Sequence, residues 1–291
     1  MTEAGWASEP SDPELTIAFQ GRPGAYSHMA CRQAFPELAV LPCHSFEDAF
    51  AAVREGQARL AMIPVDNTLA GRVADVHHLL PRGGLHIIGE HFVRVNHQLL
   101  GVPGAALEAI RSVESHVHAI GQCRDFLRRH KLQARVVADT AGAAADIAAA
   151  GDPSRAAIAS RLAAEIYGLE ILRSDIEDAE HNTTRFLVLA RESRLPDAKD
   201  GPVMTTFTFR VRNRPAALYK ALGGFATNGV NMVKLESYVD GAFTQAEFYA
   251  DIMGHPQQEN VRLAFEELRF FSHSVEVLGV YPADRFRERV G

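Results

Sequence analysis

The residues best suited to chemistry lie in one short stretch, Asn182-Thr183-Thr184-Arg185-Phe186, which runs directly into the apolar segment 187–190. An apolar run rich in Val and Leu predicts a buried strand, so the polar residues should lie at the mouth of a rigid element. Hydroxyl donors and a guanidinium suit a small anionic substrate. Strand alternation predicts Thr184 and Phe186 on one face and Arg185 on the other. The alternative is an ordinary loop whose Asn and Thr satisfy their own backbone, with Arg185 on the surface.

Two further turns place polar groups where predicted strands end. The first is Gly21-Arg22-Pro23-Gly24-Ala25-Tyr26-Ser27, which precedes a predicted helix. Free backbone N–H groups and the positive end of the helix dipole favour an anion there. The second, Asp66-Asn67-Thr68-x-x-Gly71, follows a strand in the same way and suits a carboxylate ligand through Asn67, Thr68 and nearby amides. The first turn can also be read as a plain capped turn, and at the second Asp66 or Asn67 can simply cap the helix that follows.

The elements that must position these turns follow an α/β pattern over residues 15–190. The opening order β-α-α-β-α predicts a parallel sheet with crossover helices, in which ligands gather at strand ends. Residues 91–102 are extended and lead to a second α/β lobe, and the strand after Asn182 is expected to return to the first lobe. The predicted strands are 15–19, 60–65, 109–114, 134–138 and 155–159, and the predicted helices are 26–34, 47–54, 73–80, 119–129, 140–150 and 162–167.

A polar segment with Pro and Gly, residues 191–202, predicts a linker to a second domain at 203–282. That domain has the order βαββαβ, which is typical of the ferredoxin-like module. Its two helices can cover only one face of the sheet, which leaves surfaces for a second copy or a ligand. The predicted strands are 204–211, 230–238, 245–253 and 274–281, the helices are 215–227 and 257–270, and Asp240-Gly241 is a hairpin signal.

Composition narrows the functional class. The 291 residues carry a net charge of −6, which argues against a nucleic-acid binder. No stretch approaches the roughly 20 apolar residues of a membrane span, and residues 1–12 resemble a disordered lead-in, not a signal peptide. Three widely spaced cysteines predict a reducing cytoplasm. The 13 histidines show no metal-ligand spacing, and there is neither a P-loop nor a dinucleotide-binding glycine motif. We expect no metal and no cofactor.

The three turns in this order, followed by a βαββαβ module, resemble the prephenate dehydratase family. The resemblance covers residues 15–282, and Ser115-His116, Gln122-Cys123 and 156–160 also contribute to it. It implies an α/β fold with a bilobed, periplasmic-binding-protein-like catalytic domain at 15–190, with the active site in the cleft. The C-terminal domain resembles an ACT regulatory domain. The motifs that carry this second resemblance are Pro215-Ala216-Ala217-Leu218-Tyr219, Gly229-Val230-Asn231-Met232 and Leu235-Glu236-Ser237.

The resemblance implies conversion of prephenate to phenylpyruvate, carbon dioxide and water in L-phenylalanine biosynthesis. It implies Thr184 at the leaving hydroxyl, with Arg185 either anchoring a carboxylate or fixing the loop. The catalytic residues expected are Thr184, Arg185 and Phe186; the substrate-binding residues are Ser27, Asn67, Thr68, Gly71, Asn182 and Thr183. The residues expected to bind an effector, L-phenylalanine, at a subunit interface are Ala216, Ala217, Leu218, Asn231, Glu236 and Ser237. A cytoplasmic homodimer or homotetramer is expected.

The sequence departs from the family pattern at three places. Asp66-Asn67-Thr68 stands where Glu-Asn-Ser is usual, and Thr68 keeps the hydroxyl of the usual serine. Ala216-Ala217-Leu218 replaces Gly-Ala-Leu and 236–239 replaces Glu-Ser-Arg-Pro, so effector identity or affinity can differ. No chorismate mutase segment precedes residue 15, and that activity is not expected. Two alternatives stay open: an arogenate dehydratase, and a non-catalytic amino-acid sensor, against which the retained Thr184 hydroxyl argues.

Overall fold

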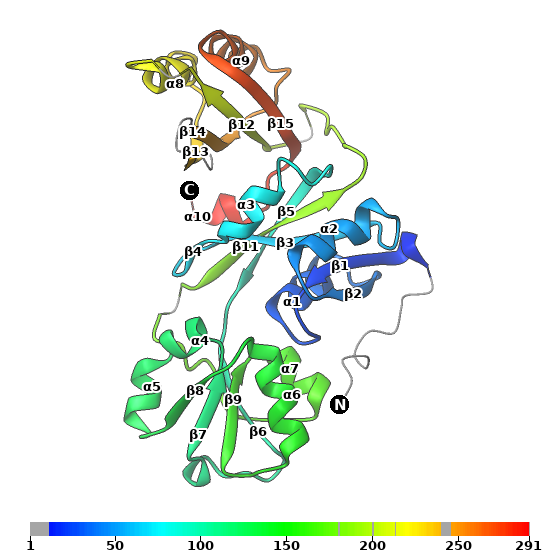
Figure 1. The fold of residues 1–291 in the computed structure, drawn as a ribbon, viewed down its shortest axis with the longest axis vertical. Helices are drawn as coiled ribbons and strands as arrows, with labels where there is room; N and C mark the ends of the chain where they lie inside the picture. The colour runs from blue at the N-terminus through cyan, green and yellow to red at the C-terminus, as the bar shows by residue number, and fades with distance from the viewer. Residues whose placement is uncertain (1–11, 180, 200, 213, 240–245, 291) are drawn as a thin grey trace. The chain divides into compact units, whose positions relative to one another are not determined.

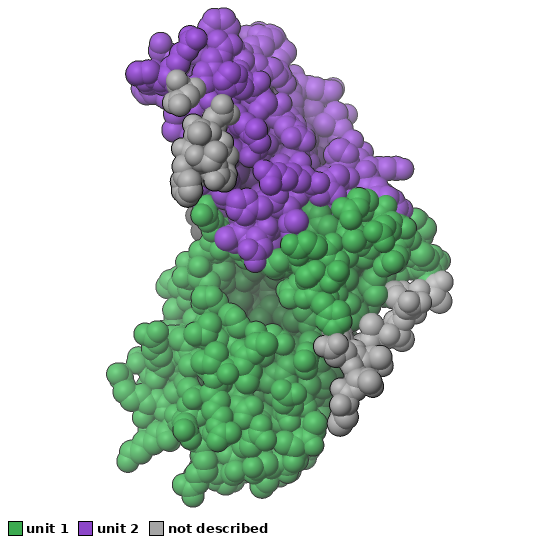
Figure 2. All heavy atoms as spheres, viewed as in Figure 1, with its two compact units in different colours: residues 1–73, 91–186 green, residues 74–90, 187–291 purple. Residues whose placement is uncertain are grey.

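The computed structural model describes residues 12–179, 181–199, 201–212, 214–239 and 246–290. It divides into two compact units, of which the first contains residues 1–73 and 91–186 and the second residues 74–90 and 187–291 (Figure 2). Strands β5 (His86–Arg94) and β11 (Thr183–Ala190) each contain residues of both units. The predicted domain limits of 15–190 and 203–282 stay predictions. In the described part of the chain, no helix or strand lies between β11 and β12 (Val203–Val211).

The first lobe of unit 1 is a parallel sheet in the order β3-β1-β2 (Figure 1). Its core is apolar: Ile17, Phe19, Phe50 and Met62 are almost fully buried. Ser45 starts α2 with a complete capping box to Asp48, as the sequence predicted. The elements of this lobe are η1 (Pro13–Leu15), β1 (Thr16–Gln20), α1 (Tyr26–Ala34), β2 (Ala39–Cys43), α2 (Phe46–Arg54), β3 (Leu60–Asn67) and β4 (Gly71–Arg72).

Strand β2 corrects the predicted order β-α-α-β-α, because it lies between the two helices α1 and α2 that the prediction placed in succession. The sequence of β2, Ala39–Cys43, contains Pro42 and is mostly half-buried or exposed, so it lacks the apolar run of a central strand. It lies at the end of the strand order, where a proline is tolerated because one side of the strand needs no ladder partner.

The second lobe of unit 1 has its own five-stranded sheet, in the order β10-β6-β9-β7-β8. Strand β7 pairs in parallel with β8 and β9, whereas β6 runs antiparallel to β9 and β10. The short strand β10 was not predicted, since Glu170–Arg173 has exposed ends, a half-buried centre and no fully buried residue. The elements are β6 (Gln98–Gly101), η2 (Leu107–Ala109), β7 (Ser112–Ser115), α4 (Val117–Gly121), α5 (Arg124–Arg129), β8 (Gln133–Val136), α6 (Thr140–Ala150), β9 (Arg155–Ala159), α7 (Arg161–Tyr167) and β10.

Unit 2 contains the predicted βαββαβ module. Its strands are ordered β13-β14-β12-β15, with antiparallel pairing throughout, and β15 continues to β5 through Gly279 opposite Ile87. Helices α8 and α9 pack on one face of this sheet around Phe207, Phe225 and Phe265. The expected hairpin at Asp240-Gly241 lies outside the described residues. The remaining elements are α3 (Ala74–Leu79), α8 (Ala217–Thr227), β13 (Met232–Val239), β14 (Ala246–Met253), α9 (Glu259–Phe271), β15 (Ser272–Pro282) and α10 (Phe286–Val290).

Part of the opposite face of this sheet is polar and buried. Thr206 donates to Asp251 (2.6 Å) and lies 2.7 Å from the Tyr281 hydroxyl. Helix α3 contacts this face through His77, whose ring meets Tyr249 edge-on at 4.9 Å between centroids. Helix α3, from the early part of the chain, therefore covers part of the second face of the predicted module.

Helix α10 was not predicted, and it is anchored by a charged pair. Arg287 donates from Nε and Nη2 to the two oxygens of Glu90, at 2.6 and 2.8 Å. Glu90 is only 8% exposed, so this two-point contact satisfies a buried carboxylate. Among the described residues no helix has both the length and the apolar content that crossing a membrane requires.

Candidate active site

The turn after β3 is built around the side chain of Asn67. Its Oδ1 accepts hydrogen bonds from the backbone N–H groups of Leu69 (2.9 Å) and Ala70 (2.7 Å), which folds the loop back on itself. Gly71 then pairs with Asn67 as β4 begins, at a positive φ of 80° that suits glycine. The helix predicted over 73–80 is confirmed as α3 (Ala74–Leu79), but the alternative in which Asp66 or Asn67 caps it is wrong, because the turn and β4 lie between them and the helix.

The stretch 182–186 lies beside this turn. Thr68 Oγ1 donates to the His181 carbonyl (2.9 Å) and accepts from the Thr183 backbone N–H (3.0 Å). The Thr68 backbone N–H donates to the Thr183 carbonyl at 3.0 Å. Thr68 therefore joins the turn at 66–71 to the stretch 182–186 through hydrogen bonds. Its hydroxyl is occupied by backbone partners, which makes it a loop-fixing group in this arrangement.

Thr184 is joined to the same turn by an amide. Asn67 Nδ2 donates to Thr184 Oγ1 (2.9 Å) and to Asn182 Oδ1 (2.7 Å). Asn182 and Thr183 are buried, and Thr184 is half-buried. Because Thr184 Oγ1 accepts from Asn67, its own proton is directed toward another acceptor. The structure thus brings Asn67, Asn182 and Thr184 into one hydrogen-bonded set.

Arg185 does not lie on the surface, which contradicts the ordinary-loop alternative. Strand β11 already begins at Thr183, and Arg185 is 6% exposed. Its Nη1 lies 3.6 Å from Asp66 Oδ2. Phe186 is 1% exposed and belongs to the apolar core of the strand. Arg185 is accordingly held against the Asn67 turn, as expected of a residue that fixes the loop.

The turn at residues 21–27 contacts the second lobe. Ser160, the N-cap of α7, donates to the Gly24 carbonyl (2.5 Å), and Tyr167 donates to the Pro23 carbonyl (2.8 Å). Gly24 has a φ of 91°, and a Cβ there would overlap the backbone of Ala163. Glycine is therefore required by both the conformation and the close approach. Ser27, in the first turn of α1, is 8% exposed.

His28 also holds this turn. The Gly24 backbone N–H donates to His28 Nδ1 at 3.1 Å. Burial lowers the pKa of His28 to about 4, with a smaller contribution from the nearby charge of Arg32. The ring is consequently neutral near pH 7, which is the state that can accept the hydrogen bond.

The second lobe contributes Gln122, which the sequence analysis did not place in the site. The single helix predicted over 119–129 is wrong, because the chain breaks between α4 and α5 at Gln122 and Cys123. Asp178 binds the start of α5: its carboxylate accepts from the backbone N–H groups of Arg124 (2.9 Å) and Asp125 (3.1 Å), which stabilises a helix start at this position. The hydrophobic period of residues 119–129 gives no indication that Asp178, much further along the chain, contacts this segment.

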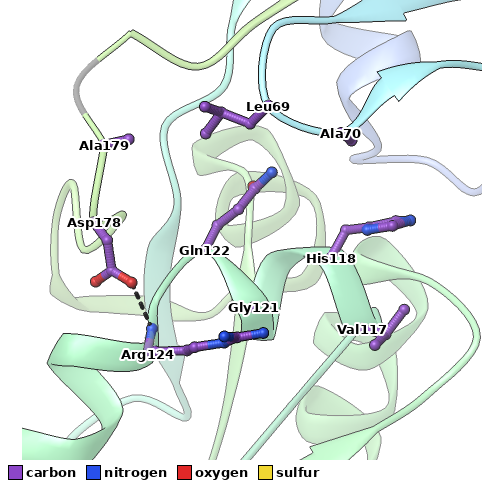
Figure 3. A pocket seen from close by; sticks show the side chains of 9 residues that line it. All are labelled: Leu69, Ala70, Val117, His118, Gly121, Gln122, Arg124, Asp178 and Ala179. Carbon is purple, nitrogen blue, oxygen red and sulfur yellow. Dashed lines mark hydrogen bonds between the residues drawn. The ribbon is translucent and has the colours of Figure 1, made fainter.

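Gln122 connects the two lobes and faces a cavity. Its Oε1 accepts from Asn182 Nδ2 at 2.9 Å. Figure 3 shows its side chain extending from the break toward the loop at Leu69 and Ala70. The cavity has a volume of about 440 Å³. It is lined by Leu69, Ala70, Val117, His118, Gly121, Gln122, Arg124, Asp178 and Ala179.

Two further residues that the sequence analysis did not place in the site continue this set. His97 Nε2 lies 2.8 Å from Gln122 Oε1, and His97 Nδ1 lies 3.0 Å from the Tyr26 hydroxyl. Tyr26 also donates to the Asn96 carbonyl at 2.8 Å. Burial lowers the pKa of His97 and raises that of Tyr26, so both side chains are neutral near pH 7. Tyr26 stood in a predicted turn, but nothing in the sequence marks His97.

The described residues contain neither a metal-binding cluster nor a reactive thiol. No group of three or more His, Cys, Asp or Glu side chains is arranged there to hold a metal ion. Cys31, Cys43 and Cys123 are buried free thiols. Burial raises the pKa of the Cys43 thiol to about 11 and raises those of Cys31 and Cys123 further. These thiols stay protonated near pH 7 and are poor nucleophiles.

The residues expected to bind an effector lie on two elements of unit 2. Ala216, Ala217 and Leu218 form the start of α8, where Ala216 has a left-handed φ of 59°. Glu236 and Ser237 lie on β13, at the end of the strand order, and Asn231 directly precedes that strand. Their role stays a prediction.

The fold and this set of side chains define the class of protein: a bilobed α/β protein with a periplasmic-binding-protein-like fold and a cavity onto which the Gln122 amide and Arg124 face. The family model described as prephenate dehydratase matches residues 17–194. The chain therefore belongs to the prephenate dehydratase family, and it is an enzyme of the carbon–oxygen lyase class. This confirms the family that the sequence resembled.

Three relatives illustrate the similarity. A bifunctional N-acyl-homoserine lactone acylase/prephenate dehydratase of Komagataeibacter europaeus is 52% identical, over 95% of this chain and 99% of the relative. The chloroplastic arogenate dehydratase/prephenate dehydratase 1 of Arabidopsis thaliana is 38% identical, over 97% of this chain and 76% of the relative. The solved structure of prephenate dehydratase in complex with L-Phe from Arthrobacter aurescens is 30% identical, with a TM-score of 0.84 over 92% of this chain and 89% of that one.

Proposed function

We propose that this chain converts prephenate to phenylpyruvate with loss of carbon dioxide and water, in the biosynthesis of L-phenylalanine. The observation that carries the proposal is the hydrogen bond from Asn67 Nδ2 to Thr184 Oγ1 (2.9 Å). It occupies an acceptor position of the hydroxyl and leaves the proton of Thr184 available for a leaving group. A biosynthetic enzyme of this kind is expected in the cytoplasm.

The proposed reaction balances without a cofactor. The bond from the ring to its carboxylate breaks to release carbon dioxide, and its electron pair moves into the ring. The bond from C4 to the hydroxyl breaks in turn, and the departing oxygen takes a proton to leave as water while the ring becomes aromatic. Thr184 delivers that proton and regains one from solvent. A threonine is a weak acid, so the Asn67 amide contributes by stabilising negative charge that develops on Oγ1.

The carboxylates of the substrate need donors, and the cavity supplies them. Gln122 and Arg124 line the cavity and are suited to a carboxylate, Gln122 through its amide and Arg124 through its guanidinium. Ser27 and Gly71, together with the backbone of the Asn67 turn, complete the proposed substrate-binding set. Thr68, Asn182 and Thr183 act in this proposal by fixing the loop that carries Thr184.

Arg185 has a positioning role in this proposal. It is buried and paired with Asp66, one residue before Asn67. The pair joins the residue after Thr184 to the residue before Asn67, so it constrains both partners of the Asn67–Thr184 hydrogen bond. Phe186 anchors the same strand in the apolar core.

The similarity to plant relatives supports a second candidate substrate, arogenate, which carries an amino group where prephenate has a keto group. Several such relatives are named as arogenate dehydratases and are 36–39% identical to this chain. The bacterial relative adds a third substrate to test, an N-acyl-homoserine lactone.

The deciding experiment offers the purified protein each substrate separately. Prephenate should yield phenylpyruvate with the highest kcat/KM; arogenate would yield phenylalanine, and an acylated lactone would yield a free fatty acid. Faster turnover of arogenate would reassign the substrate. Absence of product from both prephenate and arogenate would contradict the enzyme proposal and favour an amino-acid sensor.

Regulation by phenylalanine is part of the proposal. The Arthrobacter aurescens protein, whose structure is described as a complex with L-Phe, is 30% identical over 92% of this chain, which supports an effector site. We propose that Ala216–Leu218, Asn231, Glu236 and Ser237 hold phenylalanine between subunits of a dimer or tetramer. Rate and oligomer size measured with and without phenylalanine test this, and insensitivity to millimolar phenylalanine would contradict it.

A further inference from the structure

In the hydrogen bonds that link Asn67, Asn182, Gln122 and His97, each donor and acceptor can be assigned. The assignment starts from backbone N–H groups. Asn67 Oδ1 accepts from two backbone N–H groups, at Leu69 and Ala70. A backbone N–H can only donate, so the Asn67 amide cannot be reversed without losing both bonds. Its Nδ2 must therefore face Asn182, whose Oδ1 must be the acceptor (2.7 Å). Asn182 Nδ2 is then directed to Gln122 Oε1 (2.9 Å).

The same assignment of donors and acceptors fixes the tautomer of His97. Gln122 Oε1 faces His97 Nε2 at 2.8 Å, and an amide oxygen can only accept. His97 must consequently carry its proton on Nε2. Burial lowers the pKa of His97, so the other nitrogen, Nδ1, is unprotonated near pH 7 and can only accept. The Tyr26 hydroxyl, 3.0 Å from Nδ1, has one proton, which it shares between His97 Nδ1 and the Asn96 carbonyl at 2.8 Å.

The remaining group of this set is the Nε2 amide of Gln122. Both acceptor positions of its oxygen are used, one by Asn182 and one by His97. Gln122 lines the cavity of about 440 Å³, so its NH₂ group is left to face a ligand there. Loss of the His97 donor would leave Gln122 Oε1 with one fixed partner, and the amide could rotate its oxygen toward the anion.

His97 itself is firmly placed. Its backbone N–H donates to Glu177 Oε2 (2.8 Å), and Asn96 Nδ2 donates to the other oxygen of the same carboxylate (2.9 Å). The Tyr26 ring meets the His97 ring edge-on, with 5.7 Å between centroids. The Tyr26 hydroxyl is anchored by the Asn96 carbonyl. His97 therefore has little freedom to change its ring orientation.

We propose that His97, held by Tyr26, is a positioning residue that fixes the amide of Gln122 with its NH₂ group toward the substrate anion. The proposal rests on the proposed function for the identity of that anion, whereas the tautomer and the direction of the hydrogen bonds are independent of it.

The first test is spectroscopic and needs no substrate. Long-range ¹H–¹⁵N correlation of histidine-labelled protein near pH 7 reports which ring nitrogen carries the proton, and His97→Gln identifies the His97 signals by their loss. The expected result is a neutral ring protonated on Nε2. A ring protonated on Nδ1, or a charged ring, would overturn the proposal whether or not the protein turns over prephenate.

The second test uses a matched pair of variants. In His97→Gln a side-chain NH₂ stands near the position of the lost Nε2–H, whereas His97→Met has similar shape without a donor. The expected kcat/KM for prephenate falls by ~10-fold or more in the Met variant and stays within about 3-fold in the Gln variant. Equal thermal stability of the two variants separates positioning from folding, and equal kcat/KM in both would contradict the proposal.

A double-mutant cycle shows whether His97 acts through Gln122. In a Gln122→Met background there is no amide left to orient, so adding His97→Met should change kcat/KM by less than about 2-fold. Effects that multiply would mean that His97 acts by another route. Failure of wild-type turnover on prephenate and arogenate would contradict the proposed function, and the spectroscopic result would still decide the role of His97.

Discussion

His97 and His77 are both almost fully buried, at 2% and 3% exposure, and they are held by different kinds of neighbour. In unit 1, each ring nitrogen of His97 faces a specific polar atom, Gln122 Oε1 or the Tyr26 hydroxyl. In unit 2, His77 packs against the rings of Tyr238 and Tyr249, with Lys234 Nζ 3.5 Å from its Nε2. The same residue type is thus part of a chain of short hydrogen bonds in one region, and in the other it packs mainly against aromatic rings, with one longer polar contact to Lys234.

This difference indicates which of the two regions is better suited to bind a ligand. A directional set that begins at backbone N–H groups leaves defined atoms, such as the Thr184 proton and the Gln122 NH₂ group, directed at a ligand. A ring-packed histidine contributes mainly through contact area and shape. Substitutions in the first region should therefore change turnover, and substitutions in the second should change the free energy of unfolding.

The largest effect is expected at Thr184. Thr184→Ala should lower kcat by ~10²-fold, because the proton donor to the leaving hydroxyl is lost. Steady-state kinetics on prephenate measure this, and circular dichroism should report an unchanged fold. Thr184→Ser keeps the hydroxyl and should recover most of the rate. An Ala variant as fast as wild type would remove Thr184 from the mechanism.

The matching change in the second region is His77→Ala. Removing a buried ring that contacts Tyr238 and Tyr249 should lower the free energy of unfolding by about 2 kcal/mol, through the cavity it leaves. The kcat of the folded protein should not change. Chemical denaturation provides the measurement, and His78→Ala, at the adjacent exposed position, is the control with an effect of about 0.5 kcal/mol or less. A loss of kcat without a loss of stability would break the comparison.

A smaller loss is expected from Arg185→Lys. A lysine keeps the charge but cannot reproduce the planar guanidinium next to Asp66, so the Thr184 loop loses precision and kcat/KM should fall by ~10-fold. Arg210→Lys, in an exposed ion pair with Glu247, serves as the control and should have no effect on kcat/KM. If Arg185→Lys affected only KM, direct contact with a substrate carboxylate would be the better explanation.

The smallest effect is a gain in stability at the start of α8. Ala216 has a φ of 59°, in a region that costs an alanine about 1 kcal/mol. Ala216→Gly should therefore stabilise unit 2 by about 0.5–1 kcal/mol, offset in part by the greater freedom of glycine in the unfolded chain. Ala217→Gly, inside the helix, should have the opposite sign. Thermal unfolding of the two variants is the measurement, and a shared sign would contradict the expected strain.

Much of the fold could be predicted because capping motifs and hydrophobic patterns of neighbouring residues determine many of its helices and strands. The capping box at Ser45, the alanine-rich helix Thr140–Ala150 and the strand Arg155–Ala159 were all predicted within a residue of the observed bounds. The half-exposed edge strand β2 was missed because a strand with Pro42 and few buried residues has no clear hydrophobic period.

The site was only partly predictable for a related reason. Asn67, Asn182 and Thr184 were named from motifs, and the structure brings them together. Gln122 was named only as part of a family motif and His97 was not placed in the site, because their positions depend on tertiary contacts: Asp178 binds the start of α5 just after Gln122, and Glu177 fixes the backbone at His97. A sequence pattern with a short period cannot report a partner some 50–80 residues away.

The order in which the chain is made adds a consequence of the Asp66–Arg185 and Thr68–Thr183 contacts. Both join the first lobe to a segment that follows the whole second lobe. During synthesis, at roughly 5–20 residues per second, the second lobe is complete before Thr183 to Arg185 are added. The second lobe can therefore fold on the ribosome while the Asn67 turn still lacks its partners, and the cleft forms only when the returning strand emerges.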